Sequence, residues 1–216
     1  RLSDTQWWLE GLRVDPDMHG GKIGQHLFAF ALDFWRTKCR GVIRMLTGEN
    51  NSISQHIADK HNFLHRSTLD LYEADPLSEG VNDMQLAEMS DLEKVFDWLN
   101  ELERHPLLIP YLDYGWVINS PEKPMIKDLI SKHRIFINAE QGSVLILQPE
   151  FSQDYPVSFI QAIQPGHDEL EKVLVCARQI QAESGWGKLS WMAPVNDEIH
   201  QSLIQAGFHR IPDERV

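Results

Sequence analysis

Cysteine is scarce in this chain of 216 residues, which contains two, Cys39 and Cys176. They stand far apart, with neither a Cys-x-x-Cys pair nor the spacing of metal ligands, so a disulfide framework is disfavoured. Long apolar runs are also missing: no stretch of eighteen apolar residues occurs, and no signal-peptide pattern opens the sequence. We therefore expect neither a membrane span nor secretion, and we expect a cytoplasmic protein.

Positive charge is in short supply, because 20 Lys and Arg face 32 Asp and Glu and give a formal charge of −12 at pH 7. Nucleic acids are disfavoured as partners, since binding them draws most of its affinity from clustered Lys and Arg. Cationic small molecules such as amines are easier to attract. The 42% of apolar residues can fill a sizeable core, and the length allows one large domain or two small ones.

The N-terminal part of the sequence alternates strand patterns with helical periodicity in the order β-α-β-α-β. Strands are expected at 6–14, 41–47 and 63–72, and helices at 21–38 and 51–61. Asn51 is the expected N-cap of the second helix. Residues 75–83 are rich in turn formers, so we expect a linker there and place a domain boundary near residue 82.

The resulting domains are 1–82 and 83–216, and the second is expected to run β-α-α-β-β-β-α-β-α-β. Its strands are expected at 84–88, 134–139, 143–148, 157–163, 188–192 and in the tail, and its helices at 90–104, 168–183 and 197–206, with one more opened by Ser120-Pro121. The run Ser90-Asp-Leu-Glu93 has the pattern of a capping box.

The two halves share a spacing. Asn51 precedes Phe63 by twelve residues, and Asn196 precedes Phe208 by the same number. This spacing predicts a weak internal repeat, with chance similarity as the alternative. The second copy is shorter where the first has its glycines, so we expect only the first to keep a phosphate loop.

The most informative stretch runs from Leu9 to Leu27, an apolar strand followed by a glycine-rich turn and a helix. Such a turn leaves several backbone N–H groups unpaired at a helix N-terminus, where a diphosphate can accept them. The stretch indicates a site for a phosphate-bearing cofactor. A purely structural strand-turn-helix is the alternative.

This order of motifs resembles the GNAT superfamily of acyl-CoA-dependent N-acyltransferases. The family's loop pattern Gln/Arg-x-x-Gly-x-Gly/Ala falls on His19 to Gly24, and Asn51 and the Asn62-Phe63 pair follow in the family's order. The resemblance implies an α/β (α+β) fold of two GNAT domains in tandem, each a mixed central sheet flanked by helices, with the first seen from its fourth strand onward. Residues 11–14 are also weakly similar to the histidine N-acetyltransferase group.

The resemblance implies that acetyl-CoA binds to the first domain. Its diphosphate would accept hydrogen bonds from the backbone of Gly20, Gly21, Lys22, Ile23, Gly24 and Gln25, and its pantetheine would lie along Leu12, Arg13 and Val14. The family pattern usually has Arg or Gln where His19 stands and its first glycine where Lys22 stands. The Cβ of Lys22 would crowd a phosphate if position 22 needs a positive φ, whereas its ammonium could pair with that phosphate.

Candidate groups for the chemistry are few. Asn51 matches a family asparagine that often touches pantetheine, and an ordinary N-cap is the alternative. The family tyrosine that protonates the leaving thiolate corresponds to Ala58, so a general acid would come from elsewhere or from water. Glu10 is the candidate general base, because alternation along a strand would place it on one face with Leu12 and Val14. A Glu10 paired with Arg13 or with a neighbouring strand is the alternative.

Two other histidine patterns carry less weight. His56 is more typical of a surface residue than of a catalytic one. His61 and His65 have i,i+4 spacing, but a strand is expected to begin between them, so they would not share a helical face and no metal site is expected.

Together these features predict an N-acetyltransferase that moves an acetyl group from acetyl-CoA to a primary amine of a small molecule by direct attack. The alternative is a non-catalytic binding or regulatory protein with tandem GNAT folds, which Lys22, Ala58 and the shorter second loop favour. The identity of the amine and the oligomeric state do not follow from the sequence.

Overall fold

The computed structural model describes residues 2–80, 82–102, 117–149, 157–167 and 169–215. Its helices and strands follow one another in the order that the sequence predicts. They form two compact units, of which the first ends at Arg66 and the second runs from Ser67 to Arg215. Within the described residues, none of the helices combines the length and the apolar character needed to cross a bilayer.

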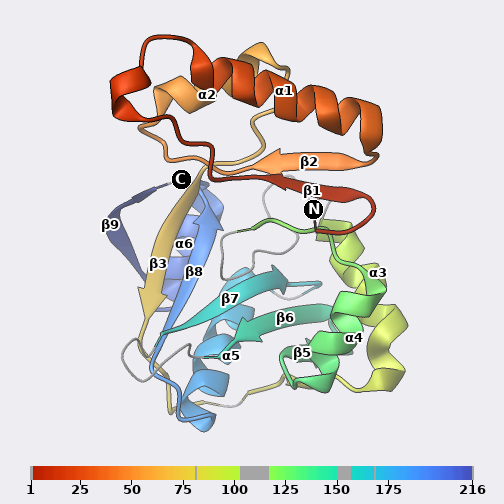
Figure 1. Ribbon diagram of the computed structural model, residues 1–216. Helices are drawn as coiled ribbons and strands as arrows, with labels where there is room; N and C mark the ends of the chain where they lie inside the picture. Colours follow the sequence, from red (N-terminus) through yellow and green to blue (C-terminus); the bar gives the residue numbers. More distant parts are fainter. Residues whose placement is uncertain (1, 81, 103–116, 150–156, 168, 216) are drawn as a thin grey trace. The chain divides into compact units, whose positions relative to one another are not determined.

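Unit 1 consists of two parallel strands with two helices lying against them (Figure 1). β1 (Gln6–Leu9) pairs with β2 (Val42–Met45), and the last pair of the ladder joins Leu9 to Met45. The connection between them contains a 3-10 turn, η1 (Pro16–Met18), and α1 (Ile23–Lys38). α2 (Ser52–Lys60) follows β2. A helical crossover of this kind is what two adjacent parallel strands require.

The core of unit 1 is small. Phe28 and Leu32 of α1 are buried together with Ile57 of α2, and partly buried Leu9, Ile43, Met45 and Phe63 pack against them. The opposite apolar side of α1 is left open, since Phe30 is 73% exposed. The helical spacing of the apolar residues therefore identified the helix correctly, although only part of its apolar surface reaches a core.

Unit 2 is built, within the described residues, on a seven-stranded and mostly antiparallel sheet with the order β4-β5-β6-β7-β8-β3-β9. Its strands are β3 (Leu69–Ala74), β4 (Gln85–Leu86), β5 (Ile135–Asn138), β6 (Ser143–Gln148), β7 (Val157–Gln164), β8 (Lys188–Pro194) and β9 (His209–Arg215). Its helical segments are the 3-10 turn η2 (Met89–Asp91), α3 (Leu92–Leu102), α4 (Lys123–Ser131), α5 (Leu170–Glu183) and α6 (Asp197–Gln205).

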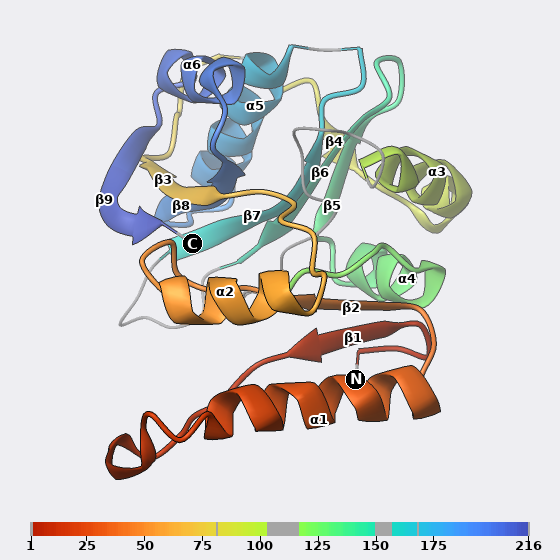
Figure 2. The same cartoon turned by 90° about the horizontal axis from the view of Figure 1, so that it is seen from above.

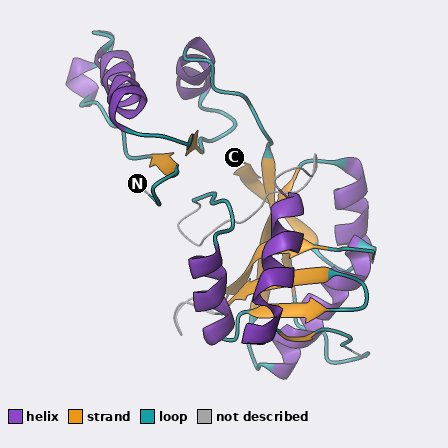
Figure 3. Ribbon diagram, turned by 90° about the vertical axis from the view of Figure 1, so that its right-hand side faces the viewer, coloured by secondary structure: helices purple, strands orange, loops and turns teal. Residues whose placement is uncertain are grey.

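The helices of unit 2 cover its sheet from two sides. α5 and α6 lie on one side, and α3 and α4 lie on the other (Figures 2 and 3). Between them lies a core far larger than that of unit 1, with Leu145 and Leu147 of β6, Leu99 of α3, Ile126 of α4 and Trp191 of β8 among its largest fully buried side chains. Because the hydrophobic effect scales with the apolar area that is buried, it stabilises unit 2 more than unit 1.

Strand β3 comes before the expected domain boundary and yet belongs to unit 2. It lies between β8 and β9 and is antiparallel to both. The turn-rich segment that follows is also fixed to unit 2, because the side-chain amide of Gln179 donates to the Glu79 carbonyl at 2.9 Å. The units therefore separate between Arg66 and Ser67, not near residue 82, because strand pairing and not the turn composition decides where β3 belongs.

Two helix starts of unit 2 also differ from expectation. The capping box forms between Glu88 and Asp91, so the 3-10 turn η2 precedes α3 and the Ser90-to-Glu93 run does not open the helix. α4 begins at Lys123 with Pro124 in its first turn, not at Ser120-Pro121. Proline is tolerated throughout the first turn, where its missing N–H would have no acceptor, so the presence of Pro121 did not fix the start of the helix. The expected end of the first of these helices, near Arg104, lies outside the described residues.

Candidate functional site

β1 ends earlier than the sequence predicts. The strand stops at Leu9, and Gly11 has a φ of +70°, a left-handed conformation that breaks the alternation of an extended chain. The prediction that Glu10, Leu12 and Val14 share one strand face is therefore wrong. Residues 10–14 instead form an irregular segment between the strand and the turn, in which Val14 is half-buried and the other four residues are exposed.

The turn after this segment carries a row of backbone donors, which we call the donor row and define as the N–H groups of Gly20 to Gln25. Among the described residues, none of these six groups has a hydrogen-bond partner; the next one, of His26, donates to the Lys22 carbonyl at 3.0 Å. Half of the row belongs to the first turn of α1, whose N–H groups lack internal acceptors in any helix, and no side chain caps this end. Consecutive free donors at the positive end of a helix dipole suit a diphosphate.

Backbone conformation shapes the donor row. Gly20 has a φ of +87° and Lys22 a φ of +58°, so both are left-handed. A Cβ on Gly20 would meet nothing within 4 Å, which means that conformation and not crowding selects glycine there. Position 22 therefore has the positive φ at which the Lys22 Cβ would crowd a bound phosphate. A left-handed lysine also costs about 1 kcal/mol of strain.

The start of α1 packs closely on the irregular segment. A Cβ on Gly24 would lie 3.5 Å from Val14 Cγ2 and 3.7 Å from Leu12 Cδ2. His19, on the other side of the turn, has its ring Nε2 3.0 Å from the Val14 carbonyl oxygen. The predicted cofactor residues from 12 to 14 and from 19 to 25 are thus brought together by contacts to Val14, which the sequence pattern did not reveal.

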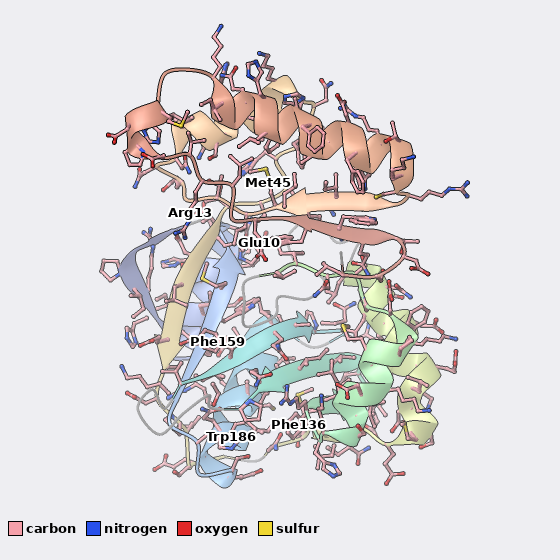
Figure 4. The ribbon with its side chains drawn as sticks, in the orientation of Figure 1. Glu10, Arg13, Met45, Phe136, Phe159 and Trp186 are labelled. Atoms are coloured by element: carbon pink, nitrogen blue, oxygen red, sulfur yellow. The ribbon has the colours of Figure 1, made fainter. Side chains whose placement is uncertain are left out.

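Glu10 is held at the end of β1 by a residue of the same strand. Trp8 Nε1 donates a hydrogen bond to Glu10 Oε2 at 3.1 Å, while no ion pair with Arg13 occurs among the described contacts. Figure 4 shows Glu10 and Arg13 near the end of β1, with Met45 between the strands and α1. From the sequence, Trp7 and Trp8 were expected to serve as core and cleft wall, and the contact of Trp8 with Glu10 was not predicted, although their spacing of two residues was a usable signal.

Asn51 caps α2. Its side-chain oxygen accepts the Ser54 N–H at 3.1 Å, which confirms the capping interpretation and leaves a second role open to experiment. On the same helix Ala58 is half-buried and His56 is exposed. In the part of the chain that the structure describes, no three His, Cys, Asp or Glu side chains gather where they could hold a metal ion.

The strand-to-helix connection of unit 2 is shorter and partly closed. The His167 N–H donates to the Gln141 carbonyl at 2.8 Å, and the Pro165 carbonyl accepts a hydrogen bond from Ser143 Oγ at 2.6 Å. Gly166, at φ +62°, lies so close to the hairpin that a Cβ would be 2.3 Å from the Gln141 carbonyl oxygen. Because the His167 N–H is already bonded, a continuous row of free donors cannot pass through this residue.

Solved structures with the same fold exist. A GNAT-family acetyltransferase from Colwellia psychrerythraea matches with a TM-score of 0.50 and 12% identity, over 94% of this chain and 74% of that chain. The GCN5-related glucosamine N-acetyltransferase region of a fungal multi-domain beta-N-acetylglucosaminidase matches with a TM-score of 0.62 and 11% identity, over 94% of this chain and 28% of that chain. No protein-family model and no curated protein matches. The predicted fold class is confirmed: a mixed sheet flanked by helices, as in GNAT acyl-CoA N-acyltransferases.

Proposed function

We propose that this protein is an acetyltransferase that takes the acetyl group of acetyl-CoA and transfers it to a primary amine of a small cytoplasmic molecule. The observation that carries the proposal is the donor row, six consecutive N–H groups without partners among the described residues, immediately ahead of and within the first turn of α1. The GNAT fold and the acetyltransferase names of the similar structures support it. We further propose that the two units are tandem GNAT copies and that the first holds the cofactor.

The proposed cofactor site has charged and neutral parts. The donor row would hold the diphosphate through neutral backbone groups and the α1 dipole. Lys22 and Arg13 are exposed cations near it, and Asp15 and Asp17 in the preceding turn offset part of their charge. Leu12 to Val14 would guide the pantetheine from the turn toward the end of β1. Bound acetyl-CoA would supply the acetyl group as an activated thioester.

Glu10 would then act as the general base. Its Oε2 is engaged by Trp8, so Oε1 is the oxygen that would take a proton from the ammonium form of the amine, directly or through a water. The neutral amine nitrogen would form the new bond to the carbonyl carbon as the bond from that carbon to sulfur breaks. The nitrogen would lose its second proton as the amide forms. Ala58 has no group that could relay a proton, so a water molecule would carry this proton to the departing sulfur.

The test of cofactor binding uses two substitutions of nearly equal size at Gly24, Gly24→Asp and Gly24→Asn. The nearest atoms to a Cβ there are at ordinary contact distance, so both variants should fold. The Asp carboxylate would compete for the donor row and repel a diphosphate. We expect calorimetry to show acetyl-CoA binding weakened at least about 100-fold by Asp, about 2.7 kcal/mol, and less than about tenfold by Asn.

The result that contradicts the binding step is equal affinity in all three proteins, or no heat and no thermal shift of the wild type at millimolar acetyl-CoA. The catalytic step is tested by thiol release with a panel of primary amines. Glu10→Gln should lower the rate while leaving acetyl-CoA affinity unchanged, because the amide keeps the hydrogen bond from Trp8 and loses the basic oxygen.

A non-catalytic binding or regulatory protein is the second candidate. It is favoured by the left-handed Lys22, by Ala58, and by the closure of the second loop at His167. It predicts that acetyl-CoA binds and that Gly24→Asp weakens binding, while no amine in the panel accelerates thiol release by the wild type. Amine-dependent release that Glu10→Gln removes would eliminate this candidate.

A further inference from the structure

We propose that His19 is a positioning residue that holds the donor row in place through Val14 and not through contact with the ligand. The effect of His19 on acetyl-CoA binding rests on the proposed function, whereas its contact with Val14 is present in the protein without ligand. The His19 ring Nε2 lies 3.0 Å from the Val14 carbonyl oxygen, five residues earlier in the chain. A carbonyl oxygen only accepts, so the ring N–H is the donor.

The remaining hydrogen bonds of the turn are local. Asp15 Oδ1 accepts the Asp17 N–H at 3.0 Å, the Asp15 carbonyl accepts the Met18 N–H at 2.9 Å, and the His19 N–H donates to the Pro16 carbonyl at 3.1 Å. These bonds shape the turn without fixing it to anything else. Among the described contacts, the hydrogen bond from the His19 ring connects the turn to the irregular segment of residues 10–14.

Val14 anchors both ends of the donor row. The row begins directly after His19, whose ring is bound to the Val14 carbonyl. Gly24, the fifth of its six members, lies against the Val14 side chain. Residues 15–22 are all exposed, so burial does not order them, whereas Val14 is half-buried. Fixing the donors before a ligand arrives removes part of the ordering cost of binding.

The contact needs an N–H donor at position 19. His19 supplies that donor when its ring carries a proton on Nε2. A glutamine side chain also carries an N–H donor and should substitute, whereas leucine has similar bulk and no donor.

The experiment compares His19→Leu, His19→Gln and a matched control, His26→Leu. His26 is an exposed histidine in the first turn of α1 whose ring makes no hydrogen bond among the described residues. The readout is the NMR order parameter of the Gly20 and Gly21 backbone N–H groups without ligand. We expect His19→Leu to lower it from about 0.85 to below about 0.6, and both His19→Gln and the control to retain it.

Acetyl-CoA affinity is measured on the same proteins, and His19→Leu should weaken it about tenfold while the other two variants bind like the wild type. Weaker binding with unchanged order parameters would overturn the proposal, because His19 would then touch the ligand. Equal loss of order in His26→Leu, or loss of order in His19→Gln, would overturn it too. If the wild type does not bind acetyl-CoA, the proposed function fails, and the order parameters still decide the role of His19.

Discussion

The strand-helix-strand-helix segments of the two units end alike. In each, an asparagine caps the second helix, Asn51 for α2 and Asn196 for α6. The three residues after each helix donate to carbonyls four, three and five positions earlier: His61, Asn62 and Phe63 in unit 1, and Ala206, Gly207 and Phe208 in unit 2. The middle residue of each triplet has a positive φ, which is common directly after the C-terminus of a helix.

The same segments differ at the connection from strand to first helix. Both parallel ladders stop early, after Leu9 in β1 and after Phe159 in β7, and an irregularity follows two residues later. In unit 1 it is left-handed Gly11, and in unit 2 it is Gln161, an extra residue that pairs with none on β6. Beyond this irregularity, the connection of unit 1 opens into the donor row, whereas the connection of unit 2 folds onto the hairpin between β5 and β6. The two segments thus have similar helix ends and differ in whether the N–H groups of the strand-to-helix connection are free or already bonded.

The largest expected effect comes from adding one methyl group to a glycine of each connection. Gly166→Ala would drive a Cβ into the backbone of Gln141 and Gly142, at a left-handed residue, and should cost about 3 kcal/mol or more. Gly20→Ala adds only the conformational cost of about 1 kcal/mol, because nothing lies within 4 Å. Urea denaturation of the whole chain measures both.

Equal destabilisation by the two substitutions would break the comparison, since it would mean that the first connection is packed as tightly as the second. A smaller loss in Gly166→Ala than in Gly20→Ala would reverse it. Because Gly20 lies in the donor row, acetyl-CoA titration of Gly20→Ala also reports how closely a ligand approaches the backbone there.

The sequence predicted what local periodicity and caps determine. The order of the elements, the extent of α2 and its cap Asn51 follow from residues within a few positions of one another. The sequence did not predict the features that depend on pairing with distant strands. β3 joins unit 2 because β8 and β9 pair with it, and no pattern within residues 67–82 contains that information.

In the candidate site, too, the features set by neighbouring residues were predicted and the others were not. The glycine-rich turn before a helix predicted the donor row, since unpaired N–H groups at a helix start are a local property. The end of β1 was placed wrongly, because the apolar pattern continues through Gly11 while its backbone turns left-handed. The contacts of Trp8 with Glu10 and of His19 with Val14 depend on side-chain direction, which spacing alone leaves open.

A smaller effect is expected from removing the matched caps. Asn196 accepts two N–H groups, of Glu198 and Ile199, and Asn51 accepts one, of Ser54. Asn196→Ala should cost about 1 kcal/mol and Asn51→Ala about 0.5 kcal/mol in urea denaturation. If Asn51 only caps, its replacement leaves acetyl-CoA affinity unchanged within error. A loss of affinity beyond about tenfold would add a ligand contact and make the two asparagines unequal in function.

The smallest expected effect separates the two roles of Lys22, the left-handed non-glycine residue at the start of α1. Lys22→Gly removes both the strain and the ammonium, and it should raise the free energy of unfolding by about 0.5 kcal/mol after the extra entropy of glycine is counted. Lys22→Ala removes the ammonium and keeps the strain, so its stability should match the wild type. If the ammonium pairs with a phosphate, both variants bind acetyl-CoA more weakly and to the same degree. If instead the Cβ crowds the phosphate, only the glycine variant gains affinity, and the first connection would then be an imperfect version of a tighter site.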